Sequence, residues 1–158
     1  MLIEVCPNLV VADMEGCGPL GVGNVGAVIH GCKNPCHLRA VGYTGSLPKD
    51  HPEYLMARRG DDLYLNIVDA PIPIFRREIF VAALDFLDEH AGSRTIVHCN
   101  NGLSRAPSTA CLWLAKRAKV IPQESWLDAK AAFLTRMPSF KPGLGIDTFL
   151  TEHWAALA

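Results

Sequence analysis

The chain has almost no excess charge, and it lacks any long apolar run. Its 158 residues include 15 Lys and Arg against 16 Asp and Glu, a net charge of −1 with neutral His. This balance provides no global attraction to nucleic acid or to an anionic membrane, so we expect neither as a partner. No segment approaches the roughly 18 consecutive apolar residues of a membrane-spanning helix. Residues 1–7 lack the basic and apolar regions of a signal peptide, and the sequence therefore predicts a cytoplasmic protein.

The chain also lacks internal repeats, low-complexity tracts and linkers. Apolar residues make up 49% of it and charged residues 20%, which is enough to bury a core and excludes wholesale disorder. A length of 158 residues suits one domain and leaves no room for a second of ordinary size. We therefore expect residues 1–158 to form a single domain and the protein to be a monomer.

Six cysteines are present, and nothing in the sequence indicates secretion. They are Cys6, Cys17, Cys32, Cys36, Cys99 and Cys111. Without secretion, and with an ample apolar core, reduced thiols are expected in place of three disulfides. Each thiol is then a candidate for chemistry, although Cys111, inside a predicted helix, is expected in the core.

Strand and helix patterns alternate along the chain. Short apolar, β-prone runs predict strands at 2–5, 9–12, 27–30, 63–68 and 95–98. Amphipathic spacing and terminal residues predict helices at 77–90, 106–119, 123–136 and 146–156. The segment 31–62 is rich in Gly, Pro and His, which favours a loop with one short helix. The alternation predicts an α/β domain with a central mixed sheet of four to five strands flanked by helices.

The segment His98–Arg105 joins a predicted buried strand to a predicted helix. A turn at this point directs successive backbone N–H groups into one concavity, where the helix dipole adds positive charge, and such a cradle suits a tetrahedral anion. Gly102 lets the backbone curl where a Cβ would obstruct the ligand. Arg105 supplies a planar fork for two phosphate oxygens. The spacing therefore indicates a phosphate-binding loop.

Cys99 lies at the start of this loop. A helix N-terminus and a nearby arginine favour the thiolate form of a cysteine, so we expect Cys99 to attack bound phosphorus. Because a thiolate needs no base, His98 is expected to brace the loop through its ring nitrogens. Taken singly, Cys99 is equally well explained as an inert core residue and Arg105 as a surface residue. Their spacing around Gly102 favours the chemical interpretation.

The run His98–Arg105 matches the H-C-x-x-G-x-x-R motif of the protein tyrosine phosphatase superfamily, and the chain resembles the compact dual-specificity branch of that superfamily. The resemblance covers residues 1–153 in outline, and only the loop is highly specific. It implies a phosphatase-like fold, with Cys99 as the nucleophile and Arg105 as the phosphate ligand. We expect no metal and no cofactor. The residues whose amides would line the phosphate cradle are Asn100, Asn101, Gly102, Leu103, Ser104 and Arg105.

Phosphoryl transfer to Cys99 expels an alkoxide or phenoxide, which a positioned acid should protonate. Asp69 ends a predicted core strand, precedes Ala70-Pro71 and lies one helix before Cys99, a place similar to that of the acid aspartate in dual-specificity phosphatases. We expect Asp69 to protonate the leaving group and then to activate water against the phosphocysteine. A plain turn residue is the alternative interpretation. Weaker candidates for the acid are Asp61, Asp62, Asp85 and Asp88.

One position departs from the resemblance. Many relatives carry Ser or Thr directly after the arginine, where the hydroxyl helps the thiolate to leave. Here the run is Arg105-Ala106-Pro107, which is similar to the Arg-Ala-Pro of the phosphatases of regenerating liver and of plant glucan phosphatases. We expect the hydrolysis of the phosphocysteine to be slow as a result.

Three other patterns are weaker. Gly21–Gly26 satisfies G-x-G-x-x-G, but a strand is predicted to follow where a dinucleotide site requires a helix. His30–His37 offers four possible zinc ligands, including Cys36, yet C-x3-C-H is not a common zinc spacing and the sequence reveals no second ligand pair. We expect a loop near the active site there, with one redox-responsive thiol. Pro138–Ile146 is loosely similar to the family's Pro-Asn-x-Gly-Phe segment, and a structural turn explains it equally well.

The chain is too short for the insertions that build a deep phosphotyrosine pocket in larger relatives. By resemblance, we expect a shallow cleft for phosphotyrosine, phosphoserine and phosphothreonine in a protein or peptide. Uncharged Asn100, Asn101 and Leu103 disfavour a phosphoinositide, and a phosphoglucan stays open because of the Arg-Ala-Pro run. A pseudophosphatase that captures phosphorylated partners is the second class. Low-molecular-weight phosphatases have the reverse order of loop and acid, and a rhodanese-type enzyme would not need Asp69.

Overall fold

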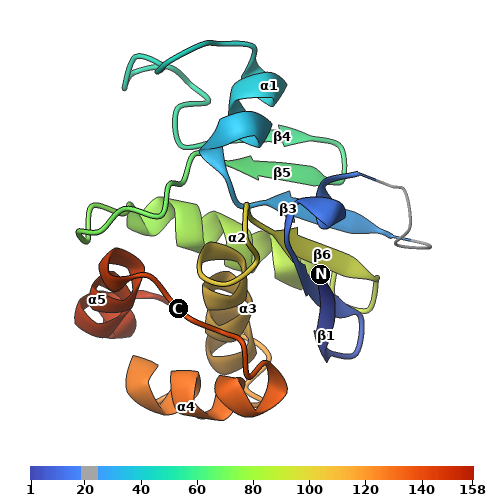
Figure 1. The fold of residues 1–158 in the computed structure, drawn as a ribbon, viewed down its shortest axis with the longest axis vertical. Coiled ribbons are helices and arrows are strands. Elements are labelled where there is room, and N and C mark those ends of the chain that lie inside the picture. Colours follow the sequence, from blue (N-terminus) through green and yellow to red (C-terminus); the bar gives the residue numbers. More distant parts are fainter. Residues whose placement is uncertain (19–24) are drawn as a thin grey trace.

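The computed structural model describes residues 1–18 and 25–158, and within these ranges the chain forms one six-stranded mixed sheet. The strands are β1 (Leu2–Cys6), β2 (Leu9–Ala12), β3 (Ala27–His30), β4 (Met56–Arg59), β5 (Asp62–Leu65) and β6 (Thr95–His98). Their order across the sheet is β1-β2-β6-β3-β5-β4 (Figure 1). The four inner strands run parallel, whereas the edge strands β1 and β4 pair antiparallel with their neighbours.

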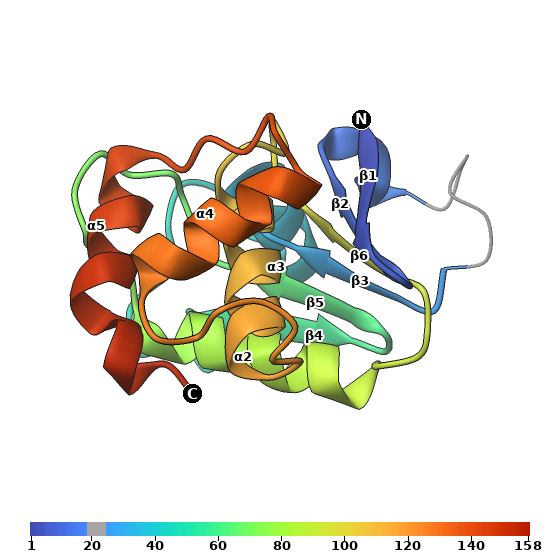
Figure 2. The ribbon, with the colours of Figure 1, turned by 90° about the horizontal axis from the view of Figure 1, so that it is seen from below.

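Helices cover one face of the sheet far more than the other (Figures 1 and 2). α2 (Arg77–Glu89) and α3 (Arg105–Lys116) pack directly on the covered face. α4 (Trp126–Arg136) packs against α3, and α5 (Leu144–His153) packs against α4. The opposite face carries a short 3-10 helix, η1 (Met14–Cys17). After β3, a helical turn at Lys33–His37 leads into the short helix α1 (Leu38–Val41).

Side chains alternate between the two faces along each strand. The larger core lies between the sheet and α2–α5 and includes Val11 and Val97. A smaller cluster on the η1 side includes Ala12 and Ile96. η1 approaches the sheet so closely that a Cβ on Gly16 would lie 2.7 Å from the Cβ of Ala12. Both faces of the sheet are therefore packed, one by the layer that contains α2–α5 and the other by η1 and the turn at Lys33–His37.

The α/β class and the flanked mixed sheet are confirmed, but the prediction of four to five strands was too low. The missing strand is β4, which lies in the segment predicted as loop. It is an edge strand in which only Ala57 is buried. Arg58 and Arg59 point to solvent, where they pair with Glu89 and Glu53 at 2.6 Å each. β4 therefore lacks the apolar run by which a strand is recognised in sequence.

The strand predicted at 63–68 is also displaced, because β5 starts at Asp62 and ends at Leu65. Beyond it, the carbonyl of Ile67 accepts hydrogen bonds from the backbone N–H of Lys33 at 3.0 Å and from the Arg105 side chain at 3.1 Å. These donors take the place of a pairing strand, so the chain leaves the sheet there. The four predicted helices are present, with ends that differ by at most three residues, and the short helix expected within 31–62 is also present.

Three smaller expectations concern the glycine pattern, the thiols and the length of the helices. Of the Gly21–Gly26 pattern, Gly21–Asn24 lie outside the described residues, and the strand predicted to follow is β3. The six cysteines are free thiols, as predicted, and Cys111 is fully buried. Among the helices of the described ranges, none combines the length and apolarity needed to cross a bilayer.

Candidate active site

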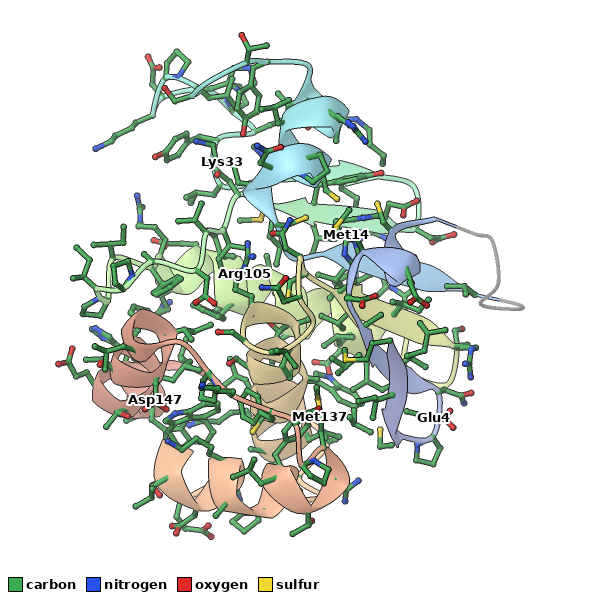
Figure 3. All side chains as sticks on the ribbon, viewed as in Figure 1. Glu4, Met14, Lys33, Arg105, Met137 and Asp147 are labelled. Carbon is green, nitrogen blue, oxygen red and sulfur yellow. The ribbon has the colours of Figure 1, made fainter. Side chains whose placement is uncertain are left out.

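The loop from Cys99 to Ser104 connects the carboxyl end of β6 to the start of α3. β6 lies between two parallel strands, so the loop leaves the centre of the sheet at the edge where α/β folds bind ligands. The backbone N–H of Cys99 donates to the carbonyl of Ala12 in β2 at 3.2 Å, which fixes the first residue of the loop. Figure 3 shows Arg105 at the N-terminal end of α3, where the loop finishes.

Gly102 occupies the point where this loop passes the N-terminal strands. Its φ is +70°, and a Cβ there would lie 2.9 Å from the amide nitrogen of Asp13 and 3.0 Å from the carbonyl carbon of Ala12. The side chain of Met1 lies against the same point, and the Met1 ammonium is held by Asp13 at 3.2 Å and Glu15 at 2.8 Å. Both the backbone conformation and the available space therefore require glycine.

We expect Gly102→Ala to destabilise the protein more than Gly45→Ala does. Gly45 has a similar φ of +74°, but a Cβ added there would meet no other residue within 4 Å, so it isolates the backbone strain of about 1–2 kcal/mol. Gly102→Ala adds steric overlap, which typically costs about 1–3 kcal/mol more. Urea unfolding of both variants measures the difference. Equal losses of unfolding free energy would contradict the close packing of the loop.

Arg105 is held in place by the loop and by the segment after β5. One Nη donates to the carbonyl of Ile67 at 3.1 Å, and the other donates to Oδ1 of Asn100 at 2.6 Å. The Nε–H is buried and has no partner within the described residues. Asn100 is fixed in turn, because its Nδ2 donates to the carbonyl of Asn34 at 3.1 Å. The guanidinium is therefore positioned before any ligand arrives and still has a free donor.

Cys99, Arg105 and Asp69 line one cleft of about 330 Å³. The thiol belongs to a residue that is only 2% exposed, so the sulfur is reached through this cleft. Lys141 adds a second cation to the lining. A thiol and a guanidinium from one loop thus meet a carboxyl group from the segment after β5. These are the groups needed for displacement at phosphorus.

Asp69 is positioned by a glycine-containing segment that the sequence pattern did not assign to the site. A Cβ on Gly143 would lie 2.5 Å from Oδ1 of Asp69, and a Cβ on Gly145 would meet the carbonyl oxygens of Ala70 and Ile72. The segment is tied to the phosphate loop as well, because the Gly143 N–H donates to Oγ of Ser104 at 2.8 Å. Residues 141–144 also line the cleft. The available sequence signal for this role was the pair Gly143 and Gly145, which lies in Pro138–Ile146 just before the helix predicted at 146–156.

Some of the other loop residues line the cleft, and others hold the loop in place. Asn101 and Leu103 line the cleft together with Ser104. The carbonyl of Leu103 accepts from the backbone N–H of Lys141 at 2.9 Å. Ala106 is fully buried at the start of α3. The loop therefore presents two uncharged side chains, Asn101 and Leu103, to an approaching substrate.

His98 does not point into the cleft. It is fully buried on the η1 side of the sheet, and its Nε2 lies 2.7 Å from Nδ1 of His30. Burial, together with the charges of His30 and Arg105, lowers the pKa of His98 to about 4. Its Nδ1 has no hydrogen-bond partner in the described part of the chain. The ring of His98 contacts His30 behind the loop, and its predicted role in bracing the loop stays a prediction.

None of the four weaker aspartate candidates is among the residues that line the cleft. Asp61 pairs with His90 at 3.1 Å, and Asp62 pairs with His30 at 2.8 Å. The remaining two, Asp85 and Asp88, both pair with the guanidinium of Arg117. Asp69 is therefore the acidic residue that the structure brings to Cys99.

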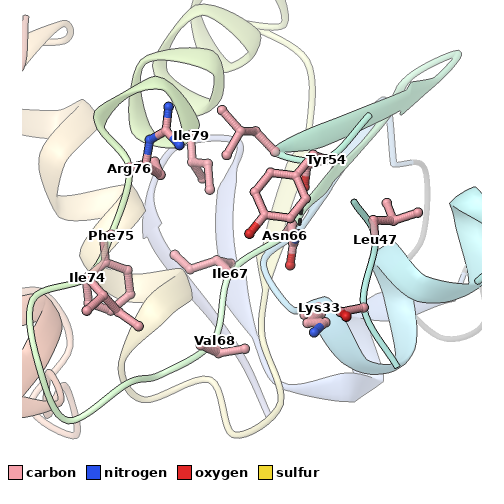
Figure 4. A pocket seen from close by; sticks show the side chains of 12 residues that line it. Lys33, Leu47, Tyr54, Asn66, Ile67, Val68, Ile74, Phe75, Arg76 and Ile79 are labelled. Carbon is pink, nitrogen blue, oxygen red and sulfur yellow. Dashed lines mark hydrogen bonds between the residues drawn. The ribbon is translucent and has the colours of Figure 1, made fainter. Parts of the chain in front are cut away.

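A second cleft of about 200 Å³ lies on the other side of the segment that contains Ile67 and Val68. Figure 4 shows Lys33 and Arg76 on opposite sides of it, with Ile67 and Val68 between them. Tyr54 forms part of its wall. The two clefts are adjacent, since Ile67 also accepts the hydrogen bond from Arg105.

No family model and no curated protein sequence matches the chain. Solved structures match over nearly its whole length. A variant of human DUSP28 is 17% identical, with a TM-score of 0.69 over 99% of this chain and 95% of that one. The human tyrosine phosphatase-like serine/threonine/tyrosine-interacting protein is 18% identical, with a TM-score of 0.69 over 98% and 96%. The Yvh1 phosphatase domain from Chaetomium thermophilum is 16% identical, with a TM-score of 0.65 over 99% and 96%. The chain therefore has the fold of the compact dual-specificity phosphatases.

Proposed function

We propose that the protein is a cysteine-dependent phosphatase, which hydrolyses phosphomonoesters through a phosphocysteine on Cys99. The observation that carries the proposal is the cleft in which Cys99, Arg105 and Asp69 meet. The fold supports it, because the chain matches structures of compact dual-specificity phosphatases over nearly its whole length. No metal or cofactor is assigned a role in this reaction.

The first step transfers the phosphoryl group to the enzyme. The Cys99 thiolate attacks phosphorus, an S–P bond forms, and the bond from phosphorus to the substrate oxygen breaks. Asp69 gives its proton to that departing oxygen. Arg105 and the loop amides stabilise the charge on the three equatorial oxygens. The Nε–H of Arg105 is buried and has no partner among the described residues, and we infer that it donates to one of these oxygens.

The second step regenerates the thiolate. Asp69, now a carboxylate, takes a proton from water as the water oxygen attacks phosphorus, and the S–P bond breaks to return the Cys99 thiolate and inorganic phosphate. Ala106 offers no hydroxyl to assist the departing sulfur, and it is fully buried. Slow hydrolysis of the phosphocysteine stays a prediction.

For the substrate, we infer a phosphorylated protein or peptide. Leu144, which lines the cleft, is 73% exposed, and Ile72, three residues after Asp69, is 56% exposed. Ile74, which lines the neighbouring second cleft, is 60% exposed. Such surfaces favour apolar or aromatic flanking groups over the hydroxyl-rich surface of a glucan. We infer that the cleft accepts phosphotyrosine, phosphoserine and phosphothreonine. A cytoplasmic location is part of the proposal.

A phospho-residue binding pseudophosphatase is the second candidate. One of the structural neighbours is named as a phosphatase-like interacting protein, so the fold by itself serves either purpose. Against pure capture, this chain retains the thiol, the guanidinium and a carboxyl group in one cleft. Turnover by the purified protein distinguishes the two.

Asp69→Asn tests the proposed role of the acid. With a phosphotyrosyl or phosphothreonyl peptide, whose leaving oxygen needs a proton, we expect kcat to fall about 10²–10³-fold. With para-nitrophenyl phosphate the fall should be much smaller, since that leaving group departs with little help from an acid. Steady-state kinetics of wild type and variant on both substrates measure the difference.

Asp50→Asn is the matched control, because Asp50 is exposed and lies outside the cleft. We expect it to retain wild-type rates on both substrates. Equal losses of kcat on peptide and aryl phosphate in Asp69→Asn would contradict the acid role. Hydrolysis of a phosphoglucan without hydrolysis of either peptide would contradict the substrate class and leave the phosphatase proposal intact.

A further inference from the structure

Four metal-binding side chains gather behind the phosphate loop, on the opposite face of the sheet from the cleft. Because side chains alternate along a strand, His98 faces η1 while Cys99 faces the cleft. β3 pairs with β6 so that His30 lies directly beside His98. Cys17 ends η1, and Cys36 lies in the helical turn after β3. Each of these four residues offers one ligand atom, and the four atoms lie within 4.8 Å of one another.

We propose that this cluster is a tetrahedral zinc site whose ligands are Cys17, His30, Cys36 and His98. Two thiolates and two imidazoles are a preferred ligand set of Zn²⁺. The site lies outside the catalytic cleft, and the proposal does not depend on phosphatase activity. It revises the expectation from sequence that the chain has no metal site.

The distances between the ligand atoms fit a zinc ion. Bond lengths of about 2.3 Å to sulfur and about 2.0–2.1 Å to nitrogen place tetrahedral ligands about 3.8 Å apart for two sulfurs, about 3.6 Å for sulfur and nitrogen and about 3.3 Å for two nitrogens. The Cys17 and Cys36 sulfurs are 3.5 Å apart. Cys17 Sγ lies 3.8 Å from His30 Nδ1, and Cys36 Sγ lies 3.9 Å from His98 Nε2. The two ring nitrogens, at 2.7 Å, need to separate by about half an ångström.

The surroundings of His30 are those of a metal-bound imidazole. Its Nδ1 faces the cluster, and its Nε2 lies 2.8 Å from Oδ1 of Asp62. A carboxylate on the far nitrogen fixes the ring and its tautomer, as commonly found at zinc sites. The ring of Tyr64 stacks on that of His30 at 4.2 Å, with an angle of 5° between the planes. His30 is therefore held in the orientation that directs Nδ1 at the proposed ion.

Burial and access agree with a structural metal. His30, Cys36 and His98 are buried, and Cys17 is half-buried. A cleft of about 250 Å³, lined by Cys17, His30 and Cys36 among others, opens to the cluster and provides an entry path. Four protein ligands leave no position for a substrate, which is typical of structural zinc.

The sequence conceals this site because its ligands come from three separate parts of the chain. His30 and Cys36 lie within the run His30–His37, whose spacing is not that of a common zinc motif. The topology adds Cys17 from η1 and His98 from β6. A metal here joins η1, β3, β6 and the turn at Lys33–His37, so its removal frees the strand end from which the phosphate loop begins.

The first test uses the wild-type protein, produced without a polyhistidine tag in zinc-supplemented medium. Elemental analysis after dialysis should give one zinc per chain. Replacement by Co²⁺ should give the visible absorption of a tetrahedral site and a thiolate charge-transfer band. Alkylation followed by peptide mapping should show Cys17 and Cys36 protected until a chelator is added. Absence of stoichiometric zinc, or equal alkylation with and without chelator, would overturn the proposal.

Variants locate the metal. Cys17→Ser and Cys36→Ser should each reduce the intensity of the cobalt charge-transfer band and should lose zinc on dialysis. Asp62→Asn should weaken the affinity for zinc about 10–100-fold. Cys6→Ser and Cys99→Ser are controls outside the cluster and should retain one zinc. Loss of zinc in Cys99→Ser, with retention in Cys17→Ser, would place the metal in the catalytic cleft and overturn the proposal.

The alternative to a zinc site is a disulfide between Cys17 and Cys36. It would require the two sulfurs to close from 3.5 Å to about 2.05 Å. Intact mass of protein purified without reductant distinguishes the two, since a disulfide lowers the mass by two hydrogens. A quantitative disulfide in protein prepared with zinc present would overturn the zinc site.

Discussion

Cys99→Ser is expected to eliminate hydrolysis of para-nitrophenyl phosphate, with a fall in kcat on the order of 10⁵-fold or more. A serine hydroxyl stays protonated in the setting where a thiol ionises, so it needs a base to become a nucleophile. The neighbouring His98 cannot act as that base, because its ring lies on the other face of the sheet and contacts His30. Release of para-nitrophenol, followed by absorbance, measures the loss.

The loss must be separated from unfolding and from a general effect of removing a thiol. Cys6→Ser is the matched control: the Cys6 thiol is half-buried outside the cleft, and burial raises its pKa, which disfavours the thiolate form. Cys6→Ser should retain wild-type kcat. Cys99→Ser should still be stabilised against heat by inorganic phosphate, since Arg105 and the loop amides remain. Retention of a tenth or more of the activity in Cys99→Ser would refute the nucleophile assignment.

The fold could be predicted from sequence where apolar runs are continuous. β2 and β6 are short runs in which every residue is buried, and both were placed at the correct residues. β4 could not be found in this way, since its pairing with β5 is set by the backbone while its arginines face water. Likewise, β5 ends early because Lys33 and Arg105 bind the carbonyl of Ile67. Such contacts between distant segments are invisible to local patterns.

The candidate site followed the same rule. Cys99, Gly102 and Arg105 were found because their spacing lies within one loop, and the chemistry constrains it. The contribution of Lys141 and Gly143 depends on how the segment before α5 folds back onto the loop, and the spacing of the glycines in that segment does not by itself indicate this contact. The proposed zinc site depends on strand order, because the adjacency of β3 and β6 brings His30 and His98 together, and on the packing of η1, which carries Cys17.

Arg105→Lys is expected to lower kcat/KM for para-nitrophenyl phosphate about 10²–10³-fold while leaving the protein folded. An ammonium retains the positive charge, but it cannot grip two phosphate oxygens in one plane. It also cannot make the two present contacts, to Ile67 and to Asn100, from a rigid fork. The cleft of this variant would keep its positive charge but lose the planar arrangement of donors that binds two phosphate oxygens.

Arg117→Lys is the matched control, since Arg117 caps the opposite end of α3 and pairs with Asp85 and Asp88 away from the cleft. A charge effect alone predicts that both variants keep most of their activity, whereas a bidentate grip on phosphate predicts a large loss for Arg105→Lys only. Inorganic phosphate should also inhibit Arg105→Lys much less than wild type, because product and transition state share the same oxygens. If Arg105→Lys keeps wild-type kcat/KM and phosphate inhibition, the guanidinium is not the phosphate ligand, and Lys141, which lines the same cleft, becomes the cation to test.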